Sequence, residues 1–190
     1  ELVHPGRIVP AVCDIVDIAG LVKGASKGEG LGNQFLGNIR ECDAIIHVLR
    51  CFDNGNIVHV DGSVDPVRDK EIIDTELQLK DLETVEARIK KTEKLANVGH
   101  DKNAKVEYGL LLRYKEALEK GLSARVVEPE NDEEAVAAKN MFLLTTKPVL
   151  YVCNVDDASA KSGNAYVDKV REATKGENAE LIVISAQTEA

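Results

Sequence analysis

Four short apolar runs, rich in β-branched residues, alternate along the chain with longer stretches of mixed character. The runs cover residues 11–18, 44–51, 148–155 and 179–185. The second and fourth are apolar almost without interruption, as expected for strands that are buried on both faces. Because helical patterns separate the runs, the sequence predicts an α/β fold built on a mostly parallel sheet.

The segments between these runs carry the periodicity of helices. An apolar residue recurs at every fourth position from Leu31 to Ile39, which predicts a helix after a glycine-rich loop. Asp132 is the expected N-cap of a second helix that runs to about Leu144. A third helix is expected over residues 161–174.

Residues 71–122 break this alternation with two apolar stripes, in which positions recur three or four residues apart. A short polar loop over residues 97–103 separates the stripes, so an antiparallel helical hairpin is expected. Helices of roughly 20–27 residues would project about 30–40 Å as an arm. The alternative is an ordinary helical pair packed on the sheet.

The pattern therefore divides the chain into three parts. Residues 1–70 and 126–190 form the two portions of one α/β domain, and residues 71–125 form the inserted hairpin.

Composition is ordinary for a globular protein, with 44% hydrophobic and 30% charged residues among 190. No apolar run reaches the roughly 18–20 residues that span a membrane, so no membrane partner is expected. The four cysteines form no C-x-x-C pair and are interpreted as core residues in a reducing compartment. His47, inside an apolar run, is interpreted as a core histidine.

Charge is distributed unevenly. The net charge of −9 argues against general attraction to nucleic acid, DNA included. Residues 88–125, however, carry ten Lys/Arg and five Asp/Glu, a balance of 10 − 5 = +5, which leaves −9 − 5 = −14 elsewhere.

The first apolar run ends in a D-x-x-G motif formed by Asp17 and Gly20. In P-loop NTPases, an aspartate at this position holds Mg²⁺ through water, and the glycine N–H contacts the γ-phosphate. The simpler alternative is an aspartate that caps a turn. Leu21 stands where Ras-like GTPases carry the glutamine that orients water, so no catalytic side chain is assigned here.

The run from Asp17 to Leu36 resembles the switch II segment of the YchF/Obg-like ATPase family, in the Obg branch of GTPase-like proteins. Residues 50–54, 57–60, 74–77 and 147–155 also resemble family segments, in family order. The resemblance implies a cytoplasmic, ribosome-associated protein that hydrolyses ATP with Mg²⁺. It also implies a Ras-like nucleotide domain, an inserted coiled-coil arm and a C-terminal TGS domain.

The chain departs from this pattern in two places. It contains no G-x-x-x-x-G-K-[ST] motif, an element that lies upstream of this segment in the family, and no TGS domain. We therefore expect an internal fragment that is inactive alone. With the central phosphate-binding strand absent, we expect the sheet to pair its open edges with another copy or to collapse.

Base recognition is expected after the third and fourth apolar runs. Asn154, Val155 and Asp157 occupy the place of the GTPase N-K-x-D motif, and Ser185 and Ala186 resemble the S-A element. Family members commonly have N-x-x-E, which is associated with adenine. The missing lysine favours ATP over GTP, although Asp157 leaves a GTP-binding protein of the Obg type, or a simple surface turn, as alternatives.

The basic arm is the expected contact with ribosomal RNA, because Lys and Arg bind phosphates without sequence preference. A solvated helix surface is the alternative, and the isolated chain could also be an inert ribosome-binding or partner-binding module. The residues expected at this contact are Arg88, Lys90, Lys91, Lys94, Lys102 and Lys105.

Overall fold

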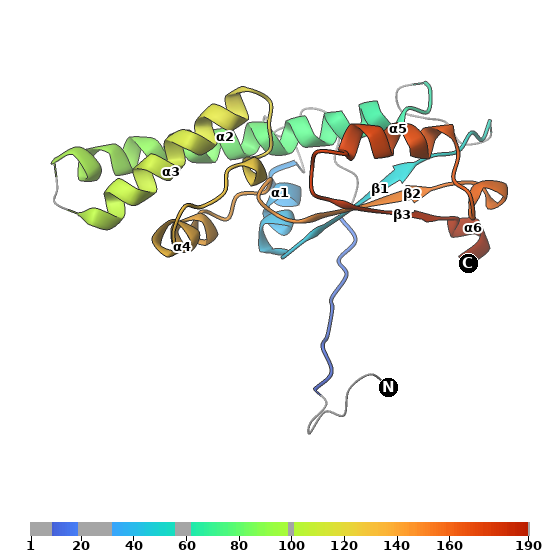
Figure 1. Ribbon diagram of the computed structural model, residues 1–190, viewed down its shortest axis with the longest axis horizontal. Helices are drawn as coiled ribbons and strands as arrows, with labels where there is room; N and C mark the ends of the chain where they lie inside the picture. The colour runs from blue at the N-terminus through green and yellow to red at the C-terminus, as the bar shows by residue number, and fades with distance from the viewer. Residues whose placement is uncertain (1–8, 19–31, 56–61, 99–100, 190) are drawn as a thin grey trace.

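The computed structural model describes residues 9–18, 32–55, 62–98 and 101–189 (Figure 1). The elements are α1 (Gly32–Glu41), β1 (Ile45–Arg50), α2 (Pro66–Val98), α3 (Lys102–Glu119), η2 (Ala124–Val126), α4 (Asp132–Met141), β2 (Val149–Asn154), η3 (Asp157–Ser159), α5 (Ala165–Thr174), β3 (Glu180–Ile184) and α6 (Ala186–Glu189).

Three parallel strands form the sheet, in the order β1-β2-β3. This confirms three of the four predicted strands and the α/β class. Helices α2 and α5 cover one face of the sheet (Figure 1). The core on that face contains Leu49, Tyr151 and Cys153 from the strands, with Val167 and Val170 from α5.

The opposite face of the sheet carries apolar side chains that the described residues leave open. Ile46 and Val48 of β1 are 48% and 60% exposed, and Ile182 of β3 is 45% exposed. The prediction that these strands are buried on both faces is therefore wrong for the part of the chain that the structure describes. A continuous apolar run shows that both faces suit burial, but it does not supply the covering layer.

The predicted strand over residues 11–18 does not form. Residues 9–18 are extended and unpaired, with Val12 85% and Ile15 78% exposed (Figure 1). A strand is stable only when a neighbour accepts and donates its ladder of hydrogen bonds, and no described segment lies beside this one. Cys13 is consequently exposed, in contrast to its interpretation as a core residue, whereas Cys51 and Cys153 are buried.

The helical hairpin forms, but its helices are unequal. α2 has 33 residues and α3 has 18, so the first is longer and the second shorter than expected. α2 begins early because Pro66 occupies its first position, where a missing N–H costs nothing, and Asp65 Oδ1 accepts from the N–H groups of Val67 and Arg68. Its first turns therefore lie over the sheet, and only its later turns pair with α3 (Figure 1).

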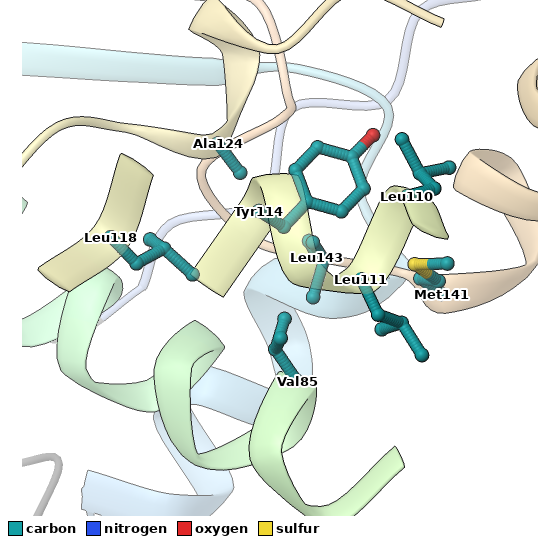
Figure 2. Close-up of a cluster of buried hydrophobic side chains, with 8 residues drawn as sticks. All are labelled: Val85, Leu110, Leu111, Tyr114, Leu118, Ala124, Met141 and Leu143. Atoms are coloured by element: carbon teal, nitrogen blue, oxygen red, sulfur yellow. The ribbon is translucent and has the colours of Figure 1, made fainter. Parts of the chain in front are cut away.

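A third layer supports the hairpin. α4 and η2 pack against α3, and together they enclose a buried cluster (Figure 2). Tyr114, which is 2% exposed, lies at its centre. The cluster consists of Val85, Leu110, Leu111, Tyr114, Leu118, Ala124, Met141 and Leu143. The arm is thus packed against α4 as well as along the seam between its own two helices.

One buried carboxylate joins the arm to the segment that leads into β2. Asp81 of α2 is fully buried and accepts from the N–H of Leu144 at 2.8 Å. It also accepts from the N–H and the hydroxyl of Thr145, both at 2.7 Å. Three donors compensate the cost of burying the charge, and the bonds fix the middle of α2 relative to the segment that leads into β2.

Candidate functional site

The predicted base-recognition residues meet at the carboxyl edge of the sheet, where open α/β sheets bind ligands. Asn154 is the last residue of β2, and its Oδ1 accepts from the N–H of Ala186 at 3.0 Å. The neighbouring N–H of Val155 donates to the carbonyl of Ile184 at 2.9 Å. These two bonds hold the end of β2 against the turn from β3 into α6.

Asp157 opens the short helix η3 and reaches the same turn. Its Oδ1 accepts from Ser185 Oγ at 2.5 Å and from Thr188 Oγ1 at 2.6 Å. The hydroxyls of Ser185 and then Thr188 lower the pKa of this carboxyl, so it is ionised at neutral pH. Its second oxygen, Oδ2, makes no hydrogen bond within the described residues.

Thr188 is a member of this group that the sequence did not predict. It lies 31 residues from Asp157 and reaches it only because α6 starts directly after β3. A threonine in a short terminal helix gives no sequence signal for this role.

Burial separates the residues of this edge that a ligand can touch from those it cannot. Val155 and Ser185 are each 2% exposed, so their side chains belong to the interior. Asp157 and Ala186 are exposed, and Asn154 is half-buried. A ligand at this edge would meet the Asp157 carboxylate, the Asn154 amide and the backbone beside Ala186.

The described structure does not bring Asp17 to this edge. Asp17 is exposed, and the adjoining Ile18 packs with Leu36, Ile39 and Ile45. Ile45 begins β1, so this cluster lies at the opposite end of the strand from the site described above. Gly20 and Leu21 lie outside the described residues. Among residues that the structure describes, no group of three or more His, Cys, Asp or Glu side chains could hold a metal ion.

The six basic arm residues fall into two groups. Arg88 donates to Glu107 at 3.1 Å and to the carbonyl of Asn140 at 2.6 Å, and Lys102 pairs with Glu133 at 2.7 Å. The other four are exposed and have no ion pair within the described part of the chain. These are Lys90, Lys91, Lys94 and Lys105.

Within the described ranges, no helix combines the length and the apolar character that crossing a bilayer requires.

Comparison with known proteins gives consistent matches. A family model described as 50S ribosome-binding GTPase matches residues 4–88. The ribosome-binding ATPase YchF of Bacillus subtilis (strain 168) is 52% identical over 191 residues, covering 100% of this chain and 52% of its own length. Obg-like ATPase 1 of Caenorhabditis elegans is 42% identical over 168 residues, covering 88% and 42%.

A solved structure agrees with these matches. The Schizosaccharomyces pombe YchF GTPase superposes with a TM-score of 0.74 and 36% identity, covering 90% of this chain and 47% of that one. The chain thus spans about half the length of the curated relatives it matches.

Proposed function

Because this chain belongs to the YchF/Obg-like ATPase family, we propose that it is the arm-bearing part of a ribosome-associated nucleoside triphosphate hydrolase of the cytoplasm. The observation that carries the proposal is a match over the whole of this chain, combined with the gathering of Asn154, Asp157 and Ala186 at the carboxyl edge of the sheet. The isolated chain, without the consecutive N–H groups and lysine of a phosphate cradle, binds nucleotide weakly and is inactive.

The proposed reaction is Mg²⁺-dependent hydrolysis of the terminal phosphate. Asp17 would hold the metal ion through water and Gly20 would contact the γ-phosphate. Leucine cannot hydrogen-bond, so Leu21 cannot orient the attacking water, and that task falls to backbone groups or another loop.

The preferred nucleotide is ATP. Guanine selection uses both oxygens of the aspartate in N-K-x-D, to accept from the ring N–H and from the exocyclic amine. Here Oδ1 of Asp157 is already engaged by Ser185 and Thr188. Val155 replaces the lysine whose stem stacks on the base, and its side chain is buried.

Replacing Thr188 with valine tests this argument. Removing the Thr188 hydroxyl leaves Ser185 as the one donor to Asp157 Oδ1 at this turn and frees an acceptor position on that oxygen, so GTP binding by the full-length protein should tighten several-fold, while ATP binding changes less than twofold. Competition between the two nucleotides measures both affinities, and Gln187→Ala is the control on the same turn. A wild-type preference for GTP would support the Obg-type alternative and contradict this assignment.

The proposed ribosome contact is the end of the arm, because Lys90, Lys91, Lys94 and Lys105 are exposed and unpaired within the described residues. Lysines that neutralise RNA phosphates release counterions, so attachment should weaken steeply as salt increases.

Four charge reversals test this contact. Replacing these four lysines with glutamate should reduce ribosome co-sedimentation at low salt at least tenfold and should flatten its salt dependence. The matched control reverses four exposed lysines outside the hairpin: Lys139, Lys161, Lys169 and Lys175. An equal loss in both quadruple variants would show that only total charge matters.

A further inference from the structure

A hollow of about 440 Å³ lies in the corner where α4 meets the hairpin. Its apolar lining comes from Val106 of α3 and from Val136 and Ala137 of α4. Val136 is 60% exposed, so this valine faces the solvent side of the corner. The hollow is separate from the carboxyl edge of the sheet, where nucleotide binding is proposed.

Three carboxylates and one cation, Arg88, surround this apolar lining. Glu107 is paired with Arg88, and Glu133 is paired with Lys102. Asp132 has neither a hydrogen bond nor an ion pair from its side chain within the described residues. The Lys102–Glu133 pair is solvent-exposed, with 77% and 50% of the two side chains accessible, so it is weak and open to exchange.

The acidity extends through the segment that supplies α4. Residues 128–140 contain five acidic residues and one lysine, a balance of 1 − 5 = −4 beside an arm segment of +5. Arg113 engages Glu130 and Glu134. Carboxylates in a first helical turn stabilise the helix, which accounts for their presence at the start of α4. Helix stabilisation does not explain why the exposed Val136 and a hollow lie among these carboxylates.

We propose that this corner binds a basic segment of a partner protein, through an arginine or lysine beside an aliphatic residue. The methylene stem lies on Val106, Val136 and Ala137, because long cationic side chains bury their stems on apolar surface and keep their charge at the rim. The cationic end pairs with Asp132 and replaces Lys102 as the ion-pair partner of Glu133. A nucleic-acid strand fits less well, because its phosphates would face the unpaired carboxylate of Asp132 and would have to compete with Glu107 and Glu133 for Arg88 and Lys102. This surface goes beyond the proposed RNA contact of the arm.

The test uses the full chain with two fluorescent probes, an eight-residue peptide of alternating leucine and arginine and a single-stranded oligouridylate. The double variant Asp132→Lys with Glu133→Lys should bind the peptide at least tenfold more weakly. The control reverses two exposed carboxylates outside this segment, Asp168→Lys in the first turn of α5 with Glu180→Lys, and should change binding less than twofold.

Two further variants keep the result interpretable. Asp132→Asn with Glu133→Gln preserves shape at the start of α4 and should still weaken peptide binding, with α4 verified by circular dichroism. Val136→Ser leaves the charge unchanged and should weaken it about threefold. Equal losses in corner and control variants, unchanged peptide binding, or oligouridylate binding that depends on Val136 would each overturn the proposal.

Discussion

At the residue scale, a buried group of charged side chains joins the first turns of α2 to the sheet. Lys70 of α2 is 5% exposed and lies between Asp74 at 2.6 Å and Glu177 at 2.5 Å. Tyr151 of β2 donates its hydroxyl to Glu177 at 2.6 Å. Removing Lys70 would leave two partly buried carboxylates without this cation, which is strongly destabilising.

His47 borders this group, and the direction of its pKa shift predicts that stability depends on pH. Its ring centre lies 5.7 Å from that of Tyr151. Burial lowers the pKa of His47 from 6.5, and the charge of Lys70 lowers it further, while Asp74 and Glu177 oppose the shift. The unfolded chain therefore binds a proton at His47 more readily than the folded chain does. The free energy of unfolding consequently falls as the pH decreases through 6.5, the ordinary pKa of histidine.

Replacing His47 with glutamine should therefore flatten the pH dependence of stability. The free energy of unfolding of the wild-type chain should decrease between about pH 7.5 and 5.5, and the variant should lose most of that decrease. Urea unfolding at several pH values measures both curves. Parallel curves for the two proteins would show that another group causes the dependence.

At the element scale, α1 is fastened to the arm as well as to the sheet. Leu36 and Ile39 of α1 pack with Leu77 of α2 and with Leu144. Lys147 donates to the carbonyls of Arg40 and Cys42, which compensates the open carbonyl groups at the end of the helix. A change in the position of α1 is therefore transmitted directly to α2.

Leu77→Ala tests this contact. Leu77 is 4% exposed, so its truncation should cost roughly 2–4 kcal/mol of unfolding free energy and should speed amide exchange over α1. Leu79, two positions along α2 and 45% exposed, is the matched control, and its truncation should cost less than about 1 kcal/mol. Similar costs at the two leucines would contradict the packing described here.

The sequence predicted the kinds of elements better than their ends. The helix expected over residues 161–174 begins at Ala165, because Gly163 has a φ of +73° and Asn164 is the N-cap. The helix expected to reach Leu144 ends at Met141, because Phe142 adopts a left-handed conformation with φ +52°. The backbone conformation and capping of the flanking residues fix these ends.

At the candidate site too, the sequence predicted some features and missed others. Sequence order was enough to predict that Asn154, Asp157, Ser185 and Ala186 meet, because consecutive parallel strands end at one edge of the sheet. It was not enough to find Thr188, whose role depends on the direction of α6. The sequence also could not show that Arg88 and Lys102 form ion pairs with Glu107 and Glu133.

At the scale of the whole molecule, the sheet is covered on one face only within the described residues. Ile46, Val48 and Ile182 form an exposed apolar surface, and the extended segment over residues 9–18 adds Val12 and Ile15. Apolar surface of this kind promotes association.

Replacing Ile46, Val48 and Ile182 with threonine should reduce self-association of the isolated chain. Threonine suits a strand and presents a hydroxyl to solvent, so the sedimentation-average mass should approach the monomer value of 20.6 kDa. The control places threonine at exposed apolar positions elsewhere, Leu112, Leu122 and Val126. Association that persists in the sheet variant would assign it to another surface.

The length of α2 has a mechanical consequence. At 1.5 Å per residue its 33 residues extend about 50 Å without an intervening break. Lys70, through Glu177, and Asp81, through Leu144, hold the first half of α2 in place, so its second half can move as a lever. From Asp81 to its end at Val98 the helix extends about 25 Å, so a tilt of about 5° at Asp81 would displace the far end by roughly 2 Å. The hairpin thus converts a small tilt beneath it into a larger displacement at its end.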